Sequence, residues 1–343
     1  MLEYYGRLMS IFSKNKYDFI AIGDTVTDAF IRLNIESAHV ELDHGNGREI
    51  CMRFGDKIPY DDVHVVAGVG NAANAAVSAA RLGLNAAFVS NVGNDEHGKE
   101  ILKVFKKEGI ADDFIKVHND IPTNYHYVLW YKDERTILIK HQQYPCKLPD
   151  IGEPGWIYFS SLGENSLDFH EEVADYLEAH PNIKLAFQPG TFQMKLGKEK
   201  LKRIYARANA FFCNKEEAQR ILGVDDADIK NLLQSLASIG PQIVVITDGI
   251  KGAYAYNGKE VYFIPLYPDP KPPISRTGAG DAFSSTFTVA LALDKDIKEA
   301  LRWGPINSMS VVQQIGARAG LLTRKELEGY LTKAPADYYP KEI

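Results

Sequence analysis

Short apolar runs alternate with helix-length segments along most of this chain, and no other feature of the sequence constrains the fold as strongly. Strands are predicted at 17–23, 86–90, 156–160, 183–187, 208–213 and 242–247. Helices are predicted between them, for example at 72–82, where an alanine-rich run stops at Gly83, and at 95–109. Strands joined by helices imply βαβ units, so we predict an α/β fold with helices on both faces of a mainly parallel sheet.

Two strand-rich stretches, at about 31–66 and 121–143, interrupt this alternation. The first shows no helical period, and the second is typical of a hairpin around the polar turn 132–135. Both are too long to be plain loops of an α/β core. We interpret them as two insertions that form one small β-sheet lid on a single domain spanning 1–343. Two unrelated surface excursions are the alternative.

Composition and charge argue against several classes of protein. The 343 residues are 45% hydrophobic and 24% charged, which is ordinary for a globular chain. A formal net charge of −6 argues against a protein that coats nucleic acid or an anionic membrane. The longest nearly apolar run, 287–293, is shorter than a membrane-spanning helix, and residues 1–16 lack the apolar core of a signal peptide. We therefore expect a cytoplasmic protein with no nucleic-acid or membrane partner.

The three cysteines, Cys51, Cys146 and Cys213, lie far apart in the sequence and form no C-x-x-C pair. Neither a disulfide framework nor a zinc site is indicated by this spacing.

The sharpest motif is the glycine-rich segment 276–283, RTGAGDAF, which opens a helical run to about residue 293. Small residues let a ligand approach the backbone, and the first N–H groups of a helix form an anion site. Asp281 would stand in the first turn, where a carboxylate repels bound phosphate. That position makes sense if Asp281 takes a proton from an attacking hydroxyl. A plain helix N-cap is the alternative, and the spacing alone does not separate the two.

A second segment, 68–74, has the sequence GVGNAAN and matches the G-x-G-x-x-A pattern of a dinucleotide-binding turn. The strand after it ends in Ser90 and Asn91, where an acidic residue for the ribose would be needed. A polar loop that offers Asn74 to a small hydroxylated ligand fits better.

Two other strand ends carry weaker signals. Asn214 and Glu217 open a helix and could reach phosphate oxygens and a water-ligated Mg²⁺, although a plain N-cap explains them too. The segment 247–252, TDGIKG, could line a nucleotide or simply form a turn. The P-loop, H-E-x-x-H and G-x-S-x-G motifs are absent.

The histidines near the second strand-rich stretch are His118, His126 and His141. We interpret them as surface or packing residues, since no metal-binding or catalytic spacing relates them.

Taken together and in this order, these motifs resemble the ribokinase-like (PfkB) family of carbohydrate and nucleoside kinases, over about residues 17–330. Segment 277–281 looks like the family's C-terminal signature, and 70–110 looks like its N-terminal one. The pair Asn214-x-x-Glu217 corresponds to the motif that positions Mg²⁺ and phosphate. The resemblance implies a three-layer α/β/α sandwich with a small β-sheet lid, and a kinase that uses ATP and Mg²⁺.

The resemblance also implies roles for individual residues. Asp281 would be the catalytic base, and the anion hole would comprise Gly278, Ala279 and Gly280. The acceptor would bind at Asp28, Gly70 and Asn74. The nucleotide would bind at Asn214, Thr247, Gly249, Gly252, Thr277 and Asn307, and Glu217 would hold Mg²⁺ through water. The lid would close over the acceptor, and in several members of the family it pairs two subunits, so a homodimer through the lid is considered.

The sequence departs from the family pattern in places. Val69 stands where many relatives have a glycine, which affects the shape of the acceptor loop. Ser275 and Arg276 precede Thr277 where ribokinases usually have Asp-Thr, and this puts a monovalent-cation site in doubt. A sugar-binding glutamate is replaced by Ser160-Ser161, and Gln188 stands where an asparagine often faces the nucleotide.

We therefore predict an ATP-dependent phosphotransferase that acts on a hydroxyl of a sugar or sugar-like molecule. A nucleoside kinase is the first alternative, because Tyr125, Tyr127 and Trp130 in the lid could stack on a base; cross-strand packing also explains these rings. A non-catalytic sugar sensor is the alternative from another class, and the intact 278–281 segment argues against it.

Overall fold

The computed structural model describes residues 16–42, 47–132, 134–226 and 228–343. Residues 1–15 therefore lie outside the described residues, and they make up all but Lys16 of the segment in which we predict no signal-peptide core. Asp133, within the predicted hairpin turn, also lies outside them. Among the described helices, none is both long enough and apolar enough to span a membrane. The cytoplasmic location stays a prediction.

A ten-stranded sheet forms the centre of the molecule, in the order β16-β15-β14-β13-β12-β11-β10-β1-β6-β7. Its strands are β1 (Phe19–Ile22), β6 (Ala86–Gly93), β7 (Ile115–His118), β10 (Trp156–Phe159), β11 (Lys184–Phe187), β12 (Ala210–Asn214), β13 (Ile243–Thr247), β14 (Ala253–Tyr256), β15 (Val261–Ile264) and β16 (Lys341–Glu342). The run from β7 to β13 is parallel, and the last three strands are antiparallel.

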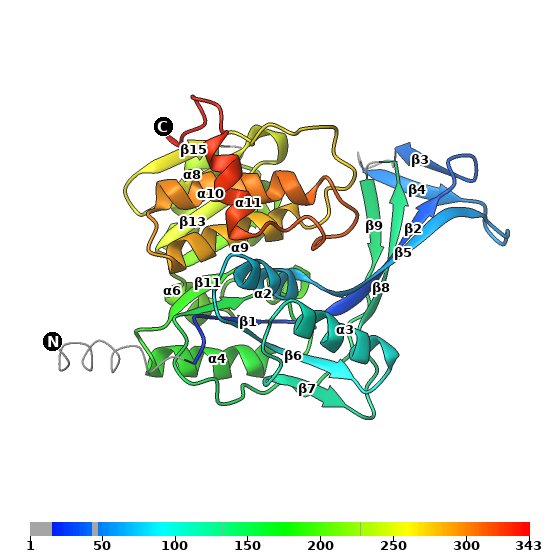
Figure 1. Cartoon of the computed structure of the whole chain (residues 1–343), viewed down its shortest axis with the longest axis horizontal. Coiled ribbons are helices and arrows are strands. Elements are labelled where there is room, and N and C mark those ends of the chain that lie inside the picture. The colour runs from blue at the N-terminus through cyan, green and yellow to red at the C-terminus, as the bar shows by residue number, and fades with distance from the viewer. Residues whose placement is uncertain (1–15, 43–46, 133, 227) are drawn as a thin grey trace.

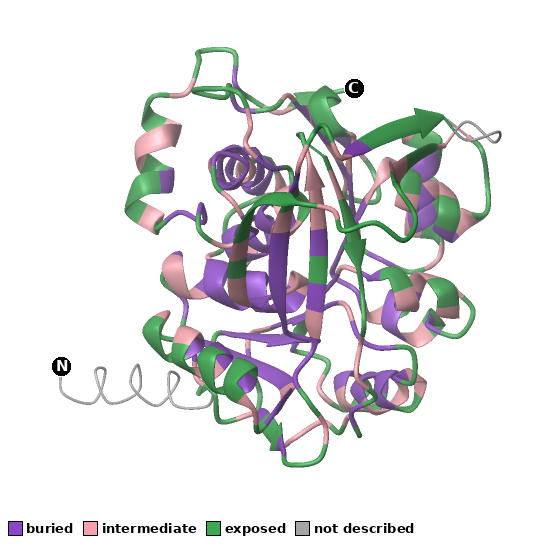
Figure 2. Cartoon of the chain, turned by 90° about the vertical axis from the view of Figure 1, so that its right-hand side faces the viewer, coloured by how far each residue is buried: buried purple, intermediate pink, exposed green. Residues whose placement is uncertain are grey.

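Helices cover both faces of this sheet, because its strands are apolar on both sides. In β1, Phe19 and Ala21 belong to one core cluster, whereas Ile20 and Ile22 belong to the other. The first cluster includes side chains of α2 (Asn71–Arg81), α3 (Glu96–Lys107), α9 (Ala279–Ala292), α10 (Ile297–Val311) and α11 (Arg324–Thr332). The second includes side chains of α4 (Leu167–Ala179), α5 (Thr191–Leu196), α6 (Lys202–Arg207), α7 (Lys215–Leu222) and α8 (Ile229–Ser238). The predicted three-layer α/β/α sandwich is confirmed, and Figure 2 shows its buried strands at the centre.

A separate four-stranded sheet, called the second sheet below, has the order β5-β2-β8-β9. Its strands are β2 (Val26–Leu33), β5 (Tyr60–Val69), β8 (Tyr125–Tyr131) and β9 (Glu134–Leu138). Segments about 100 residues apart in sequence thus pair directly, with Asp28 of β2 beside His126 of β8. The sheet begins earlier than the predicted stretch, at Val26, because β2 follows β1 after only a short turn.

Two further strands, β3 (Ala38–Leu42) and β4 (Arg48–Met52), form their own two-stranded ribbon. Figure 1 shows the second sheet standing beside the main body, with this ribbon at its outer end. The second sheet therefore offers one face to the main body, and the ribbon projects beyond it.

Candidate active site

A cavity of about 790 Å³ lies between the second sheet and the edge of the central sheet. Its walls include Asp24, Asn214 and Thr247, which stand at or just after the carboxyl ends of β1, β12 and β13. Open parallel sheets bind ligands at this edge, and the volume suits a small molecule together with a nucleotide fragment. Residues from β8 and β9 close the cavity from the other side.

The N-terminus of α9 forms one end of the cavity. Gly278 caps the helix with a φ of 82°, and a Cβ there would lie 2.3 Å from the Cβ of Ala317, so only glycine fits. The Ala282 N–H donates to the Gly278 carbonyl at 2.8 Å, which makes it the first backbone bond of the regular helix. The N–H groups just before it have no i−4 acceptor within the helix, and they stand at the positive end of the helix dipole. The loop can therefore receive an anion.

Asp281 lies in the first turn of α9 and in the cavity wall. The Asn74 amide donates to one of its carboxylate oxygens at 2.9 Å, and the Gln188 amide donates to the other at 3.2 Å. Burial raises the pKa of Asp281, while these two amides act in the opposite direction. Two side chains thus hold the carboxylate in place, and its raised pKa makes it a stronger proton acceptor.

The opposite end of the cavity contains polar groups that lack partners. Asp28 is 9% exposed, and its Oδ1 and the Asn74 Oδ1 are buried without a hydrogen bond in the described structure. Unpartnered buried polar atoms are costly, and a ligand with hydroxyl groups would satisfy them. Burial raises the pKa of Asp28 to about 7, with Asp281 adding to the effect and Arg135 opposing it.

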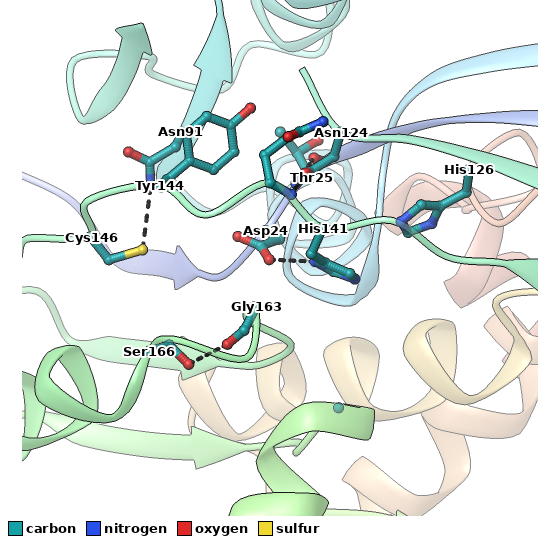
Figure 3. Close-up of polar contacts among 12 residues, drawn as sticks. Asp24, Thr25, Asn91, Asn124, His126, His141, Tyr144, Cys146, Gly163 and Ser166 are labelled. Atoms are coloured by element: carbon teal, nitrogen blue, oxygen red, sulfur yellow. Dashed lines mark hydrogen bonds and ion pairs between the residues drawn. The ribbon is translucent and has the colours of Figure 1, made fainter. Parts of the chain in front are cut away.

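Two histidines stand beside these aspartates. The His141 Nδ1 lies 2.7 Å from the Asp24 carboxylate, and Figure 3 shows the two side chains turned toward each other. The His126 Nδ1 lies 3.6 Å from the Asp28 carboxylate, and its Nε2 has no partner in the described structure. Burial and the neighbouring His141 lower the pKa of His126 to about 4, so His126 is neutral at pH 7.

Both histidines line the cavity, a position that their interpretation as surface or packing residues did not anticipate. By contrast, His118 is 7% exposed and pairs with the Asn91 side chain at 2.9 Å, as a packing residue does.

Arg135 reaches the cavity from β9. Its Nε is buried without a hydrogen-bond acceptor in the described structure, and the guanidinium influences the carboxyl groups of both Asp28 and Asp281. A fixed positive charge thus stands near the point where the two ends of the cavity meet. A lone arginine in a hairpin has no distinguishing local pattern, so the sequence carries no signal for Arg135.

Asn214 and Glu217 form a capping box at the start of α7. The Glu217 N–H donates to the Asn214 side chain at 2.8 Å, and the Asn214 N–H donates back to the Glu217 carboxylate at 2.9 Å. Both residues also line the cavity, so the N-cap and the ligand-binding interpretations coexist. Burial raises the pKa of Glu217, and Asp281 adds to this effect. A cation would stabilise both carboxylates here, and oxygen ligands suit Mg²⁺, so the residues fit this ion.

The other residues predicted to bind the nucleotide fall into two groups, those that line the cavity and those that do not. Thr247, Gly249 and Thr277 line the cavity. Gly252 does not: it is buried, and a Cβ on it would lie 2.3 Å from the Ile264 carbonyl oxygen, so it shapes the turn into β14. Asn307 is fully buried in α10, where its side chain donates to Thr286 and accepts from the Leu322 N–H. The proposed contact of Asn307 with a nucleotide is therefore corrected to a packing role.

The fold brings residues predicted for the anion hole and for the acceptor loop together in the wall of one cavity. Gly278, Gly280 and Gly70 line the cavity, whereas the Ala279 side chain does not. Gly70 caps α2 with a φ of 117°, and a Cβ there would lie 2.9 Å from the Asp24 carbonyl oxygen.

The three lid aromatics lie outside the cavity walls. The Tyr125 ring is tilted against His97 and Tyr127, and Trp130 lies under the guanidinium of Arg32 at 5.3 Å. These rings therefore pack against neighbours on α3 and the second sheet, whereas Phe192 lines the cavity and contacts His141 edge-on. Because these three rings do not line the cavity, they give no support to a nucleoside base stacking on them.

The model of the pfkB family of carbohydrate kinases matches residues 17–324. A ribokinase of Bacillus subtilis is 30% identical over 274 residues, which cover 77% of this chain and 87% of the relative. A nucleoside kinase of Methanothermobacter thermautotrophicus is 25% identical over 308 residues, covering 89% and 92%. The solved structure of Arabidopsis thaliana ribokinase with ribose and ATP superposes with a TM-score of 0.75 at 20% identity, covering 92% of this chain and 98% of that one.

The family model spans most of the chain, and the matching structure shares its sandwich of layers. The cavity that this fold creates holds the glycine-rich helix start and the carboxylate that the sequence motifs had indicated. This chain therefore belongs to the pfkB family of carbohydrate kinases.

Proposed function

We propose that this protein transfers the γ-phosphoryl group of ATP to a hydroxyl group of a sugar or sugar-like acceptor. The observation that carries the proposal is the position of Asp281, which two amides hold in the first turn of α9. A carboxylate next to an anion site has no use in phosphate binding, but it serves as a base for a hydroxyl that attacks the phosphate.

In this mechanism Asp281 accepts the hydroxyl proton as the acceptor oxygen bonds to the γ-phosphorus and ADP leaves. The backbone N–H groups at the start of α9 stabilise the charge on the transferred group. Arg135 adds a positive charge from the side of the second sheet. Closure of that sheet over the cavity would exclude water and limit wasteful ATP hydrolysis.

Mg²⁺, when bound, neutralises phosphate charge, and Glu217 would hold it through water. The cap formed with Asn214 keeps the Glu217 carboxylate at the cavity wall. At 275–277 the Ser275 hydroxyl donates to the Thr277 hydroxyl at 3.1 Å and accepts from the Thr277 N–H at 3.2 Å, so its bonds stay within the loop itself.

The end of the cavity that contains Asp28 and Asn74, called the acceptor end below, favours a polyhydroxylated molecule. Asp28 and Asn74 present unpartnered oxygens, and hydroxyl groups would donate to them. A nucleoside remains the second candidate, supported by the nucleoside kinase among the relatives. Its ribose could occupy the same end, with Phe192 available to a base.

The test is ADP release from Mg·ATP over a panel of sugars and nucleosides, with Asp281→Asn measured in parallel. We expect turnover with one acceptor class, and its loss in the variant. Binding of ATP without turnover of any acceptor would favour the sensor alternative, and failure to bind ATP would overturn the proposal.

We also infer that two copies pair through the outward face of the second sheet. Val65, Tyr127 and Leu138 stand in one row across β5, β8 and β9, and each is about half exposed. Val63 extends this apolar surface along β5 at 42% exposed. Such a patch is typical of an interaction site. Sedimentation velocity should find a dimer that Val65→Lys weakens, and a monomer in the unaltered chain would contradict the inference.

A further inference from the structure

The β3–β4 ribbon carries a cluster of side chains that the proposed reaction does not use. Its register places His39 opposite Cys51 and Glu41 opposite Glu49. Because side chains alternate between the two faces of a strand, these four residues share one face of the ribbon. Figure 1 shows the ribbon at the outer end of the second sheet.

Three of these side chains converge. One ligand atom each from His39, Glu41 and Cys51 lie within 4.8 Å of one another, and the His39 Nε2 is 2.8 Å from the Glu41 carboxylate. An imidazole, a carboxylate and a thiol at such distances match the ligand types of tetrahedral zinc sites. The sequence spacing conceals this set, because its members come from two strands and form no C-x-x-C or H-E-x-x-H pattern.

A second observation points to a cation on the same face. Glu41 and Glu49 stand directly opposite each other, and like charges in this arrangement destabilise a pair of strands. Cys51 lies two pairs along the ladder from these carboxylates, on the same face of the ribbon. A divalent ion bound at the cluster would offset the repulsion.

The pairing of β3 with β4 also calls for an interaction that stabilises it. It has two strands, and its other face exposes Val40, Leu42 and Met52. An isolated two-stranded ribbon is marginally stable in water. An ion that bridges β3 and β4 would hold their register in the way that structural metals stabilise small units.

We propose that the β3–β4 ribbon binds a Zn²⁺-type divalent ion through the His39 imidazole, the Glu41 carboxylate and the Cys51 thiolate. Binding forms a metal–sulfur bond and releases the thiol proton to solvent. Water or the Glu49 carboxylate completes the coordination. The site is independent of phosphoryl transfer, and its purpose would be to order the outer end of the second sheet.

The experiment uses the full chain without a polyhistidine tag, stripped with a chelator and titrated with Co²⁺ in excess Mg²⁺. The Mg²⁺ occupies sites made of oxygen ligands but does not compete for a thiolate. We expect about one equivalent of Co²⁺ to bind, with the charge-transfer absorption of a cobalt–thiolate bond, and Zn²⁺ to displace it.

Cys51→Ser should abolish the charge-transfer band, and His39→Gln should weaken binding by about tenfold or more. Matched controls are Cys146→Ser and His64→Gln, which change the same residue types outside the cluster and should leave the titration unaltered. Circular dichroism checks that each variant is folded. Absence of the band in the unaltered chain, or a band that survives Cys51→Ser, would overturn the proposal.

Discussion

At the α9 end of the cavity, the consecutive residues 276–281 supply the backbone groups and the carboxylate, whereas the acceptor end draws on separate elements. Asp28 comes from β2, Asn74 from α2, His126 from β8, and His141 from the segment after β9. The backbone of one end is thus a local structure set by a positive φ and a helix start, and only the orientation of its carboxylate depends on the distant Asn74 and Gln188. The other end exists only because distant strands pair.

The two ends should therefore differ in how well they tolerate substitutions. The proposed anion site is built from backbone groups, so it depends on the conformation of a few glycines and has little freedom to vary. A site assembled from side chains can exchange one residue at a time, which suits a family whose members are named for different acceptors. Substitutions at the α9 end should therefore remove turnover, and those at the acceptor end should change acceptor affinity.

The largest effect is expected for Asp281→Asn. The amide cannot accept the hydroxyl proton, so kcat should fall by roughly 10² or more. Nucleotide binding, followed by calorimetry, should stay nearly unchanged because the N–H groups of α9 remain. Turnover comparable to that of the unaltered chain would exclude Asp281 as the base.

Gly278→Ala tests the backbone at the same end. The new Cβ would lie 2.3 Å from the Ala317 Cβ at a φ of 82°, so the loop must move. We expect kcat to fall by about 10² and the free energy of unfolding by about 1–3 kcal/mol.

Gly329→Ala is the matched control for this change, because the Cβ there meets no atom within 4 Å and α11 accepts alanine. Denaturant unfolding should show no loss of stability in the control. Equal losses in both variants would mean that the α9 loop is not specially constrained.

Arg135→Gln tests the group that joins the two ends. If Arg135 donates to the bound acceptor or phosphoryl group, loss of that charge-assisted hydrogen bond, worth about 1.5–3 kcal/mol, should reduce kcat/KM by roughly tenfold or more. Separate values of kcat and of the acceptor KM will show whether Arg135 acts on the transferred group or on the acceptor. Arg32→Gln, which removes a second-sheet arginine that stacks on Trp130, should leave kcat/KM nearly unchanged.

The smallest effect on turnover is expected for Asp28→Asn, together with a gain in stability. Burial raises the pKa of Asp28 from 3.8 to about 7, so folding favours the protonated carboxyl. The protonated Asp28 carboxyl therefore makes its full contribution to the free energy of unfolding below pH 4, and this contribution is lost as the pH rises through 7. The variant should therefore be more stable than the unaltered chain at pH 8, by on the order of 1–3 kcal/mol, and the difference should shrink toward pH 4.

Urea unfolding at several pH values measures this difference, and Asp337→Asn provides an exposed aspartate as the control. The acceptor KM should rise in Asp28→Asn, because an amide replaces one hydroxyl acceptor. A stability difference that does not depend on pH would contradict the raised pKa of Asp28.

Local sequence signals predicted the parts of the molecule that form within one segment. The alternation of apolar runs led to the parallel strands, and the alanine-rich run before Gly83 led to α2. The glycine-rich loop led to the start of α9 and to Asp281. Such features follow from hydrophobic periodicity and turn chemistry, which act over a few residues.

Other residues could not be placed in this way. Arg135, His126 and His141 belong to the cavity, although nothing in their local sequence separates them from surface residues. Asn307 stands on a helix near the cavity but turns into the core, where Thr286 and Leu322 use its amide. Both results depend on which neighbours a side chain meets after the chain has folded.

Local sequence patterns were enough to predict the layered α/β fold, the glycine-rich helix start and the carboxylate in its first turn. The folded structure alone showed which side chains line the cavity, that Asp28 lies beside His126, and that His39 lies beside Cys51. The physical reason is distance along the chain. Backbone geometry and periodic burial are set by near neighbours, whereas a site made of side chains requires distant segments to meet, such as those of Asn74 and Asp281, which are 207 residues apart.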